Sequence, residues 1–232
     1  MPQAEPVLHL AAALPILGED SALPNVPLDL RLMPGECALI ETSDPARSTA
    51  LAELCSGMAA LRRGEARFMG YDWAGLGRER AAALRGRIGR IHHRGAWIDM
   101  LGTHVNIMLA RLHHTREPEA VVTRSATDLA RHLGLPGLPL ARPDRLSEGD
   151  LMRAACVRAF LGEPQLLLLE SSITPDRPGL TAPLLDLLSQ ALDRGAAAVC
   201  FTRDAPYWQV LNFPLAHRLY LLDDGLKPMP SV

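Results

Sequence analysis

The sequence has few aromatic residues. They make up 4% of its 232 residues, and no phenylalanine, tyrosine or tryptophan precedes Phe68. An excess of positive charge is also missing, because 24 basic and 26 acidic side chains leave a net charge of −2. Proteins that bind nucleic acid usually carry a basic surplus or stripe, so no nucleic-acid partner is expected. One local arginine cluster, from Arg78 to Arg94, is interpreted as a solvated face.

Long apolar runs are absent as well. No run approaches the roughly 18–20 apolar residues that a membrane-spanning helix needs, so we expect no direct membrane insertion. The apolar stretch from Val7 to Leu17 lacks a positive flank and is interrupted by Pro15, which makes it a poor signal peptide. If the protein acts at a membrane, a partner has to hold it there.

Cysteines are few and none forms a C-x-x-C pair. Each lies in an apolar setting, so we expect buried, reduced thiols and a cytosolic location; the four are Cys37, Cys55, Cys156 and Cys200. Two adjacent histidine pairs occur, His92–His93 and His113–His114. Neighbours on a strand point to opposite faces, so neither pair predicts a metal site.

What the sequence does contain is an alternation of strand and helix patterns. Hydrophobic residues make up 48% and charged residues 22%, which is ordinary for a soluble globular protein. Residues 28–40 predict two strands joined by a turn at Pro34–Gly35. A loop and a helix from about Ser48 follow, because apolar residues then recur at helical spacing: Leu51, Leu54, Cys55 and Met58.

The rest of the chain continues this alternation. Residues 95–150 are predicted to be mainly helical, and Ser147 with Asp150 matches a helix-capping box. Further elements are predicted as strands at 65–70, 87–92, 165–169 and 196–202, helices at about 118–134, 147–164 and 181–193, and a hairpin turn at Asp224–Gly225. Buried strands between helices favour a mostly parallel α/β core. We therefore expect a single domain over 1–232, with a core at about 1–93 and 151–232 and an inserted α-helical subdomain at about 94–150.

In this order the segments resemble the nucleotide-binding subunits of ABC transporters. The clearest stretch is LSEGDLMRAACVRAFLGEPQLLLLE (146–170), which resembles the LSGGQ signature, its helix and the Walker B strand. PGECALIETSDPARSTALAEL (34–54) resembles the turn, strand and Walker A loop, VCFTRDAP (199–206) the switch-histidine segment, and LLDDG (221–225) the closing strand and turn. The resemblance covers residues 28–226 and implies a P-loop NTPase-like ABC ATPase core. GAWIDM, Asn106 and HTREPEAV also resemble the helical subdomain of Mla-type phospholipid-transport ATPases.

The resemblance implies a site for ATP and Mg²⁺. It assigns nucleotide contacts to Ser43, Arg47, Ser48, Thr49, Ser147 and Gly149, and the Mg²⁺ ligands to Ser48 and Glu170. The catalytic positions are degenerate: Glu170–Ser171 stands for the Walker B Asp-Glu pair, His93 for the Q-loop glutamine and Arg203 for the switch histidine. Ser171 has no carboxylate with which to polarise a water, and arginine is not a general base at neutral pH.

The Walker A loop departs furthest from the pattern. Its three glycine positions hold Glu41, Asp44 and Ala46, and Pro45 has no N–H to donate. A positive φ at a residue other than glycine costs roughly 1–2 kcal/mol, and a carboxylate about 4 Å from a phosphate charge adds roughly 4 kcal/mol at an effective dielectric of 20. We therefore favour a loop that only joins strand to helix, and expect weak or absent hydrolysis. The aromatic platform for adenine is also missing.

Three functions stay open. The first is a pseudo-ATPase that scaffolds or regulates a membrane transport complex, bound to a permease and forming a homodimer or a heterodimer with another ABC ATPase subunit, at the inner face of the cell membrane. The second is an active ATPase that uses Arg47, Ser48 and Glu170. The third is a soluble interaction module unrelated to transport, which a fully polar 95–150 surface would favour. Ser147 is either part of a lid over a partner's nucleotide, a helix N-cap, or both.

Overall fold

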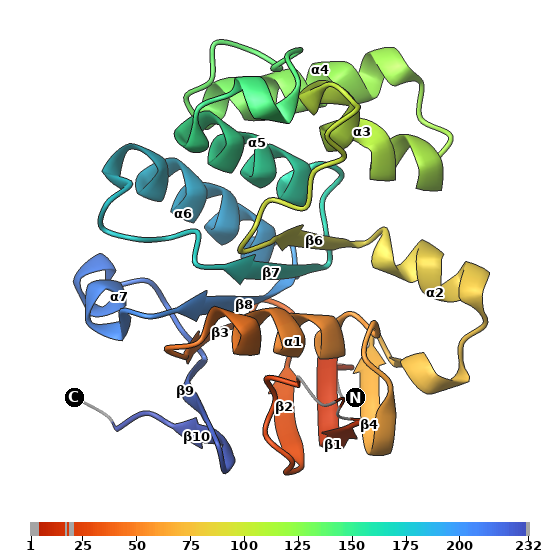
Figure 1. Ribbon diagram of the computed structural model, residues 1–232, viewed down its shortest axis with the longest axis vertical. Coiled ribbons are helices and arrows are strands. Elements are labelled where there is room, and N and C mark those ends of the chain that lie inside the picture. The colour runs from red at the N-terminus through yellow and green to blue at the C-terminus, as the bar shows by residue number, and fades with distance from the viewer. Residues whose placement is uncertain (1–4, 17, 19–20, 231–232) are drawn as a thin grey trace.

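The computed structural model describes residues 5–16, 18 and 21–230. Its elements form layers, with a parallel sheet in the middle, helices on one side and a helix and a second sheet on the other (Figure 1). The central sheet has the strand order β10-β9-β3-β8-β7-β6. Only β10 runs antiparallel to its neighbour. Its strands are β3 (Cys37–Glu41), β6 (Ile88–Ile91), β7 (Leu166–Glu170), β8 (Ala197–Thr202), β9 (His217–Leu222) and β10 (Gly225–Pro228).

The central strands are apolar throughout because both faces of the sheet are covered. Along β7, Leu166 and Leu168 join the core on one face, and Leu167 and Leu169 join the core on the other. This period of two follows from the alternation of side chains along a strand. All four cysteines are buried and free, as predicted.

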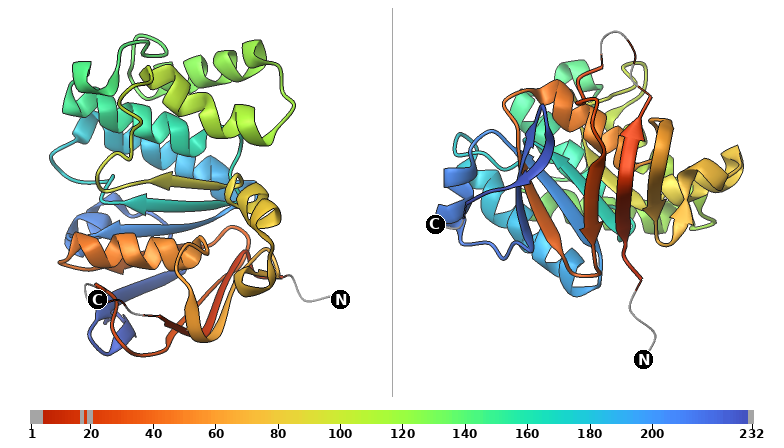
Figure 2. Two further views of the ribbon diagram at one scale, coloured as in Figure 1. Left: turned by 45° about the vertical axis from the view of Figure 1, so that its right-hand side comes forward. Right: turned by 90° about the horizontal axis from the view of Figure 1, so that it is seen from below.

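A second, antiparallel sheet covers one face of the core, and Figure 2 shows it from below. Its order is β2-β1-β4-β5, formed by β1 (Leu8–Pro15), β2 (Leu28–Leu32), β4 (Leu61–Phe68) and β5 (Tyr71–Asp72). The apolar N-terminal stretch, for which no element was predicted, thus contains a strand at Leu8–Pro15, while Leu17 lies outside the described residues. Gly64, at a φ of +80°, lies so close to Ala12 that an added Cβ would be 2.0 Å from the Ala12 carbonyl oxygen. Only glycine fits there.

The helices are α1 (Pro45–Cys55), α2 (Arg78–Arg85), α3 (Thr103–His114), α4 (Glu119–His132), α5 (Glu148–Phe160), α6 (Pro178–Asp193) and α7 (Ala205–Leu211), with 3-10 turns at Trp73–Gly75 and Pro143–Arg145. The helix predicted from Ser48 begins earlier, at Pro45, because proline fits the first turn and Asp44 caps it. Helices α2 and α7 were not predicted.

Helices α3, α4 and α5 pack together above the sheet (Figure 1). The predicted boundary at residue 150 falls within the first turn of α5, and α5 belongs to the same core as both β6 and α3. The 94–150 segment is therefore joined to the core by a continuous helix. In the part of the chain that the structure covers, no helix combines the length and apolar character needed to cross a bilayer.

Candidate functional site at the carboxyl edge of the parallel sheet

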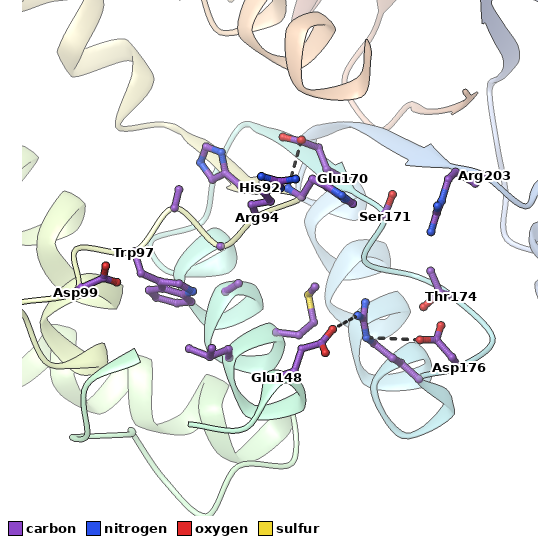
Figure 3. A pocket seen from close by; sticks show the side chains of 17 residues that line it. His92, Arg94, Trp97, Asp99, Glu148, Glu170, Ser171, Thr174, Asp176 and Arg203 are labelled. Atoms are coloured by element: carbon purple, nitrogen blue, oxygen red, sulfur yellow. Dashed lines mark hydrogen bonds and ion pairs between the residues drawn. The ribbon is translucent and has the colours of Figure 1, made fainter. Parts of the chain in front are cut away.

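The predicted site residues meet where the parallel strands end. In a parallel sheet the carboxyl ends of the strands lie at one edge, where α/β proteins bind their ligands. His93, Glu170, Ser171 and Arg203 line one pocket of about 760 Å³ at this edge (Figure 3). The Walker A-like loop, between β3 and α1, lies at the same edge.

This loop does not have the shape of a phosphate cradle. None of residues 41–46, all of them described, has a left-handed φ, so the predicted strain of replacing glycine does not arise. Four backbone N–H groups of the loop also have acceptors within the protein. Thr42 N donates to Thr202 O at 3.0 Å, Asp44 N to Thr42 Oγ1 at 3.4 Å, Ala46 N to Asp44 Oδ1 at 2.8 Å and Arg47 N to Asp44 O at 3.1 Å.

The Asp44 carboxylate lies at the N-terminus of α1. It caps the first turn of α1 through the Ala46 N–H, and a helix N-terminus favours an anion both by its free N–H groups and by its dipole. The anion here belongs to the chain itself. Ser43, a predicted nucleotide contact, lies in the same short loop between β3 and α1.

Arg47 points away from the loop. Its guanidinium forms an ion pair with Asp223 and donates to the Leu221 carbonyl at 3.5 Å, both at the β9–β10 hairpin. The positive charge at the Walker A basic position is therefore directed to the β9–β10 hairpin. Ser48 is buried and donates to Pro45 O at 3.2 Å within its own helix.

Thr49, rather than Ser48, contacts the Walker B carboxylate. Its hydroxyl donates to Glu170 Oε2 at 2.6 Å, and the His93 N–H donates to the same oxygen at 3.3 Å. Arg90 Nε donates to the other oxygen, Oε1, at 2.8 Å, and Arg90 Nη2 donates to Thr49 O at 3.1 Å. Three elements, α1, β6 and β7, are joined through one carboxylate.

The Glu170–Arg90 pair is withdrawn from solvent. The exposed fractions of the two side chains are 0% for Glu170 and 12% for Arg90. A buried carboxylate requires a paired cation and hydrogen bonds to its lone pairs, and Glu170 has both. Arg90 was predicted to belong to a solvated arginine face, and that prediction is wrong, because β6 carries it into the sheet. The guanidinium stands beside the carboxylate at which the resemblance places Mg²⁺.

The remaining catalytic positions lie around the same pocket without forming a reactive pair. Ser171 has a φ of 49°, and its N–H donates to Phe201 O at 3.1 Å. A non-glycine residue in this region is strained by roughly 1–2 kcal/mol. Arg203 is exposed and forms no ion pair among the described residues.

His92 is held neutral in the folded protein. Burial, followed by the charges of Arg90 and Arg158, lowers its pKa to about 4 from 6.5. Between these two pH values the unfolded chain binds more protons, so stability falls as pH drops. We expect this group to cost roughly 1–2 kcal/mol between pH 7 and 4, discounted because the ring is partly exposed.

Replacing His92 by asparagine should flatten that part of the pH dependence, measured as the free energy of urea unfolding at several pH values. Equal slopes for His92→Asn and the wild type would contradict the assignment.

The signature-like segment keeps its helix cap. Ser147 Oγ accepts the Asp150 N–H at 3.1 Å, as the capping box predicts. Glu148, in a glycine position of the family signature, forms an ion pair with Arg177 at 3.1 Å. Gly149 has no Cβ, and this leaves room for the Arg153 side chain at the start of α5. A Cβ added there would lie 3.3 Å from Arg153 Nη1.

A second pocket, of about 860 Å³, lies beside the loop. It is bounded by the segment after β1, including Ile16 and Leu23, and by Asp44 and Glu53 of the α1 region. Among the described residues that line it there is no phenylalanine, tyrosine or tryptophan. The carboxylates of Asp44 and Glu53 thus face the space next to the α1 N-terminus. The described lining offers no phenylalanine, tyrosine or tryptophan ring on which adenine could stack.

The fold is that of ABC-type ATPase domains. It superimposes on the dimeric structure of a post-hydrolysis ATP-binding cassette bound to ADP and Pi with a TM-score of 0.81 and 19% identity, covering 97% of this chain and 100% of that one. An ATP-binding subunit of an ABC transporter gives a TM-score of 0.80 at 18% identity, over 97% and 90% of the two chains. These likenesses confirm the predicted fold class.

Relatives by sequence are ATP-binding proteins of transport systems. The chain is 27% identical over 169 residues to the intermembrane phospholipid transport system ATP-binding protein MlaF of Haemophilus influenzae, covering 72% of this chain and 64% of that protein. It is 30% identical over 198 residues to the phosphonates import ATP-binding protein PhnC of Anaeromyxobacter dehalogenans, covering 82% and 39%. The chain thus spans less than two thirds of these relatives' lengths, and no family model matches it. The predicted resemblance to ABC transporter ATP-binding subunits is confirmed.

Two residues of the site were missed from the sequence. Asp44 directly before Pro45 is a helix-start signal, and it was counted only as a lost glycine. Arg90 interrupts an apolar strand, and a charge in a buried strand requires a partner. Glu170, at the end of the next apolar strand, was the available carboxylate.

Proposed function

We propose that this chain is a degenerate ABC-type subunit that does not hydrolyse ATP, and that it scaffolds or regulates a membrane transport complex. The observation that carries the proposal is that side chains and carbonyls of the chain itself accept the hydrogen bonds of the Walker A-like loop. Four of its N–H groups have acceptors within the chain, Pro45 has none to offer, and the Asp44 carboxylate caps α1. A triphosphate would have to displace that carboxylate and meet its negative charge.

The residues predicted to bind Mg²⁺ also have partners within the chain. Glu170 already has a guanidinium and two hydrogen-bond donors, and a cation brought to it would face the positive charge of Arg90. Among the described residues Ser48 forms no hydrogen bond with Glu170, and its hydroxyl donates to Pro45 O. These residues do not fit Mg-ATP bound as the family binds it, so ATP and Mg²⁺ are not assigned as cofactors. Ser171 and Arg203 supply no general base.

An exposed apolar area supports a protein partner. Met100 is 82% and Leu140 70% exposed, and they lie on adjoining segments, since Thr103 N donates to Ala141 O at 2.9 Å and His104 N to Pro139 O at 2.9 Å. Ile98, 43% exposed, extends the area. The 95–150 surface is therefore not fully polar, which disfavours an interaction module unrelated to transport.

The partner proposed for this area is a membrane permease. The complex would be a homodimer or a heterodimer with another ABC ATPase subunit, at the cytoplasmic face of the membrane. The relatives' names point to lipid transport as the setting, because several are ATP-binding proteins of an intermembrane phospholipid transport system.

The proposal is tested by calorimetry with Mg-ATP and a parallel hydrolysis assay on the purified chain and on Arg47→Ala. We expect no turnover in either protein and no ATP binding that depends on the Walker A-like loop, so Arg47→Ala should give the same titration curve as the wild type. Turnover of roughly 1 s⁻¹ or more, within the ordinary range of enzymes, that disappears in Arg47→Ala would instead establish an ATPase with a rewritten site. Binding without turnover would support a regulatory nucleotide site.

A further inference from the structure

A third pocket, of about 650 Å³, lies far from the P-loop-like edge. It is formed by β5, α2 and the end of α3; Figure 1 shows where the two helices lie. Its lining comprises Tyr71, Leu76, Arg80, Ala83, Leu84, Gly86, Arg87, Arg111, His114 and Thr115. Three arginines and a histidine line it, and none of these ten residues is acidic. The pockets at the sheet edge, in contrast, contain several carboxylates.

The positive charge of the pocket lining exceeds the negative charge that the surrounding structure supplies. Arg111 forms an ion pair with Glu117 and bonds to Gly162 O at 3.5 Å. Arg80 and Arg87 have no side-chain hydrogen bond or ion pair within the described residues. The C-termini of α2 and α3 both end at this pocket, and each contributes roughly half a negative charge. Together they offset about one arginine, so a cationic surplus remains.

Close packing fixes the arrangement of the two helix ends. A Cβ added to Gly86 would lie 2.9 Å from Cδ2 of His114, so glycine at the end of α2 lets the His114 ring lie against the backbone. His114, the last residue of α3, thus packs against the end of α2. This contact joins α2, which belongs to the core side, to the helical layer.

Part of the pocket lining is apolar. Leu76, Ala83 and Leu84 line it, and Tyr71 is 55% exposed at its edge. Guanidinium groups bind phosphate oxygens in paired hydrogen bonds, and a tyrosine ring offers a face for a flat or apolar group. The lining therefore suits a ligand that is anionic at one end and apolar at the other.

We propose that this pocket binds a phosphate monoester that carries an apolar or aromatic group, through Arg80, Arg87 and Tyr71. A nucleotide and the headgroup region of phosphatidic acid share that chemistry. The site is separate from the Walker A-like loop, so it does not depend on whether that loop binds ATP.

The test is titration calorimetry of the full chain, without Mg²⁺, with phenyl phosphate, inorganic phosphate and AMP as probes. Flotation with phosphatidylcholine vesicles, with and without phosphatidic acid, distinguishes the lipid source. The variant is Arg80→Gln/Arg87→Gln. The control is Arg78→Gln/Arg124→Gln, which removes the same charge from exposed positions outside the pocket.

We expect phenyl phosphate to bind the wild type and the control alike, more tightly than inorganic phosphate, and at least about tenfold more weakly to Arg80→Gln/Arg87→Gln. Tyr71→Ala should reduce the preference for phenyl phosphate over inorganic phosphate. AMP binding without vesicle binding would identify the nucleotide source, and the reverse would identify the lipid. Equal affinity in both double variants, or no binding of any probe, would overturn the proposal.

Discussion

Replacing Arg90 by methionine should lower the free energy of unfolding by about 3–5 kcal/mol, because it leaves the buried Glu170 carboxylate without its cation. Thr49 and His93 would still donate to that carboxylate, but two neutral donors do not offset the burial of a charge. Equilibrium urea unfolding at neutral pH measures the loss.

Two controls separate burial from pairing. Arg67→Met breaks an ion pair of similar geometry, Arg67 Nε to Glu65 Oε2 at 2.9 Å, whose side chains are 42% and 46% exposed. It should cost less than about 1 kcal/mol. The double variant Arg90→Met/Glu170→Gln removes both charges and should recover part of the loss. A loss for Arg90→Met as small as that for Arg67→Met would mean that Glu170 finds solvent or another cation, and the pair would lose its structural role.

The fold was predictable because its signals are redundant. Apolar strands such as Leu166–Glu170 and the amphipathic α4 repeat the same periods that burial imposes. The segments without such patterns were the ones missed: α2 is rich in arginine and mostly exposed, and β1 is as apolar as a buried element of either type. For β1, pairing with β2 and β4 decides the conformation, and pairing is not visible in local sequence.

The sequence predicts which family residues the site has lost, but it does not predict which contacts replace them. Lost glycines and the Glu170–Ser171 pair can be read residue by residue. The substitute contacts join positions far apart in sequence, such as Thr49 with Glu170 and Arg47 with Asp223. Side-chain direction settled these contacts, and it depends on the packing of α1 against β7 and the closing hairpin. Arg47 thus keeps the positive charge of the Walker A basic position, but its side chain pairs with Asp223 instead of contacting a nucleotide site as predicted.

The replacements have a common character. Where the family places an exogenous anion at the start of the helix, this chain has the Asp44 carboxylate. Beside the carboxylate at which the family places a metal cation, it has the Arg90 guanidinium. Both are attached to the chain, so no ligand is needed to neutralise the helix end or Glu170. A subunit stabilised in this way would keep the ABC frame without nucleotide, as a scaffold requires.

Rebuilding the loop should restore Mg-ATP binding without restoring hydrolysis. The variant combines Glu41→Gly, Asp44→Gly, Pro45→Ser, Ala46→Gly and Arg47→Lys, which removes two carboxylates and returns an N–H donor and a compact ammonium. We expect affinity at least about a hundredfold above the wild type, or roughly 3 kcal/mol, since each carboxylate near a phosphate contributes up to about 4 kcal/mol of repulsion. Turnover should stay absent because Ser171 is unchanged.

The single variant Asp44→Asn is the matched control for the rebuilt loop. Asparagine caps a helix about as well as aspartate, so stability should be retained while one charge is removed, and the amide should still occupy the Ala46 N–H. We therefore expect little gain in ATP affinity from Asp44→Asn, measured by the same calorimetry after circular dichroism has established that each variant is folded. No gain in the rebuilt loop either would locate the obstacle at the Arg90–Glu170 pair or at the missing aromatic platform. Hydrolysis by the rebuilt chain would show that Ser171 is not what prevents catalysis.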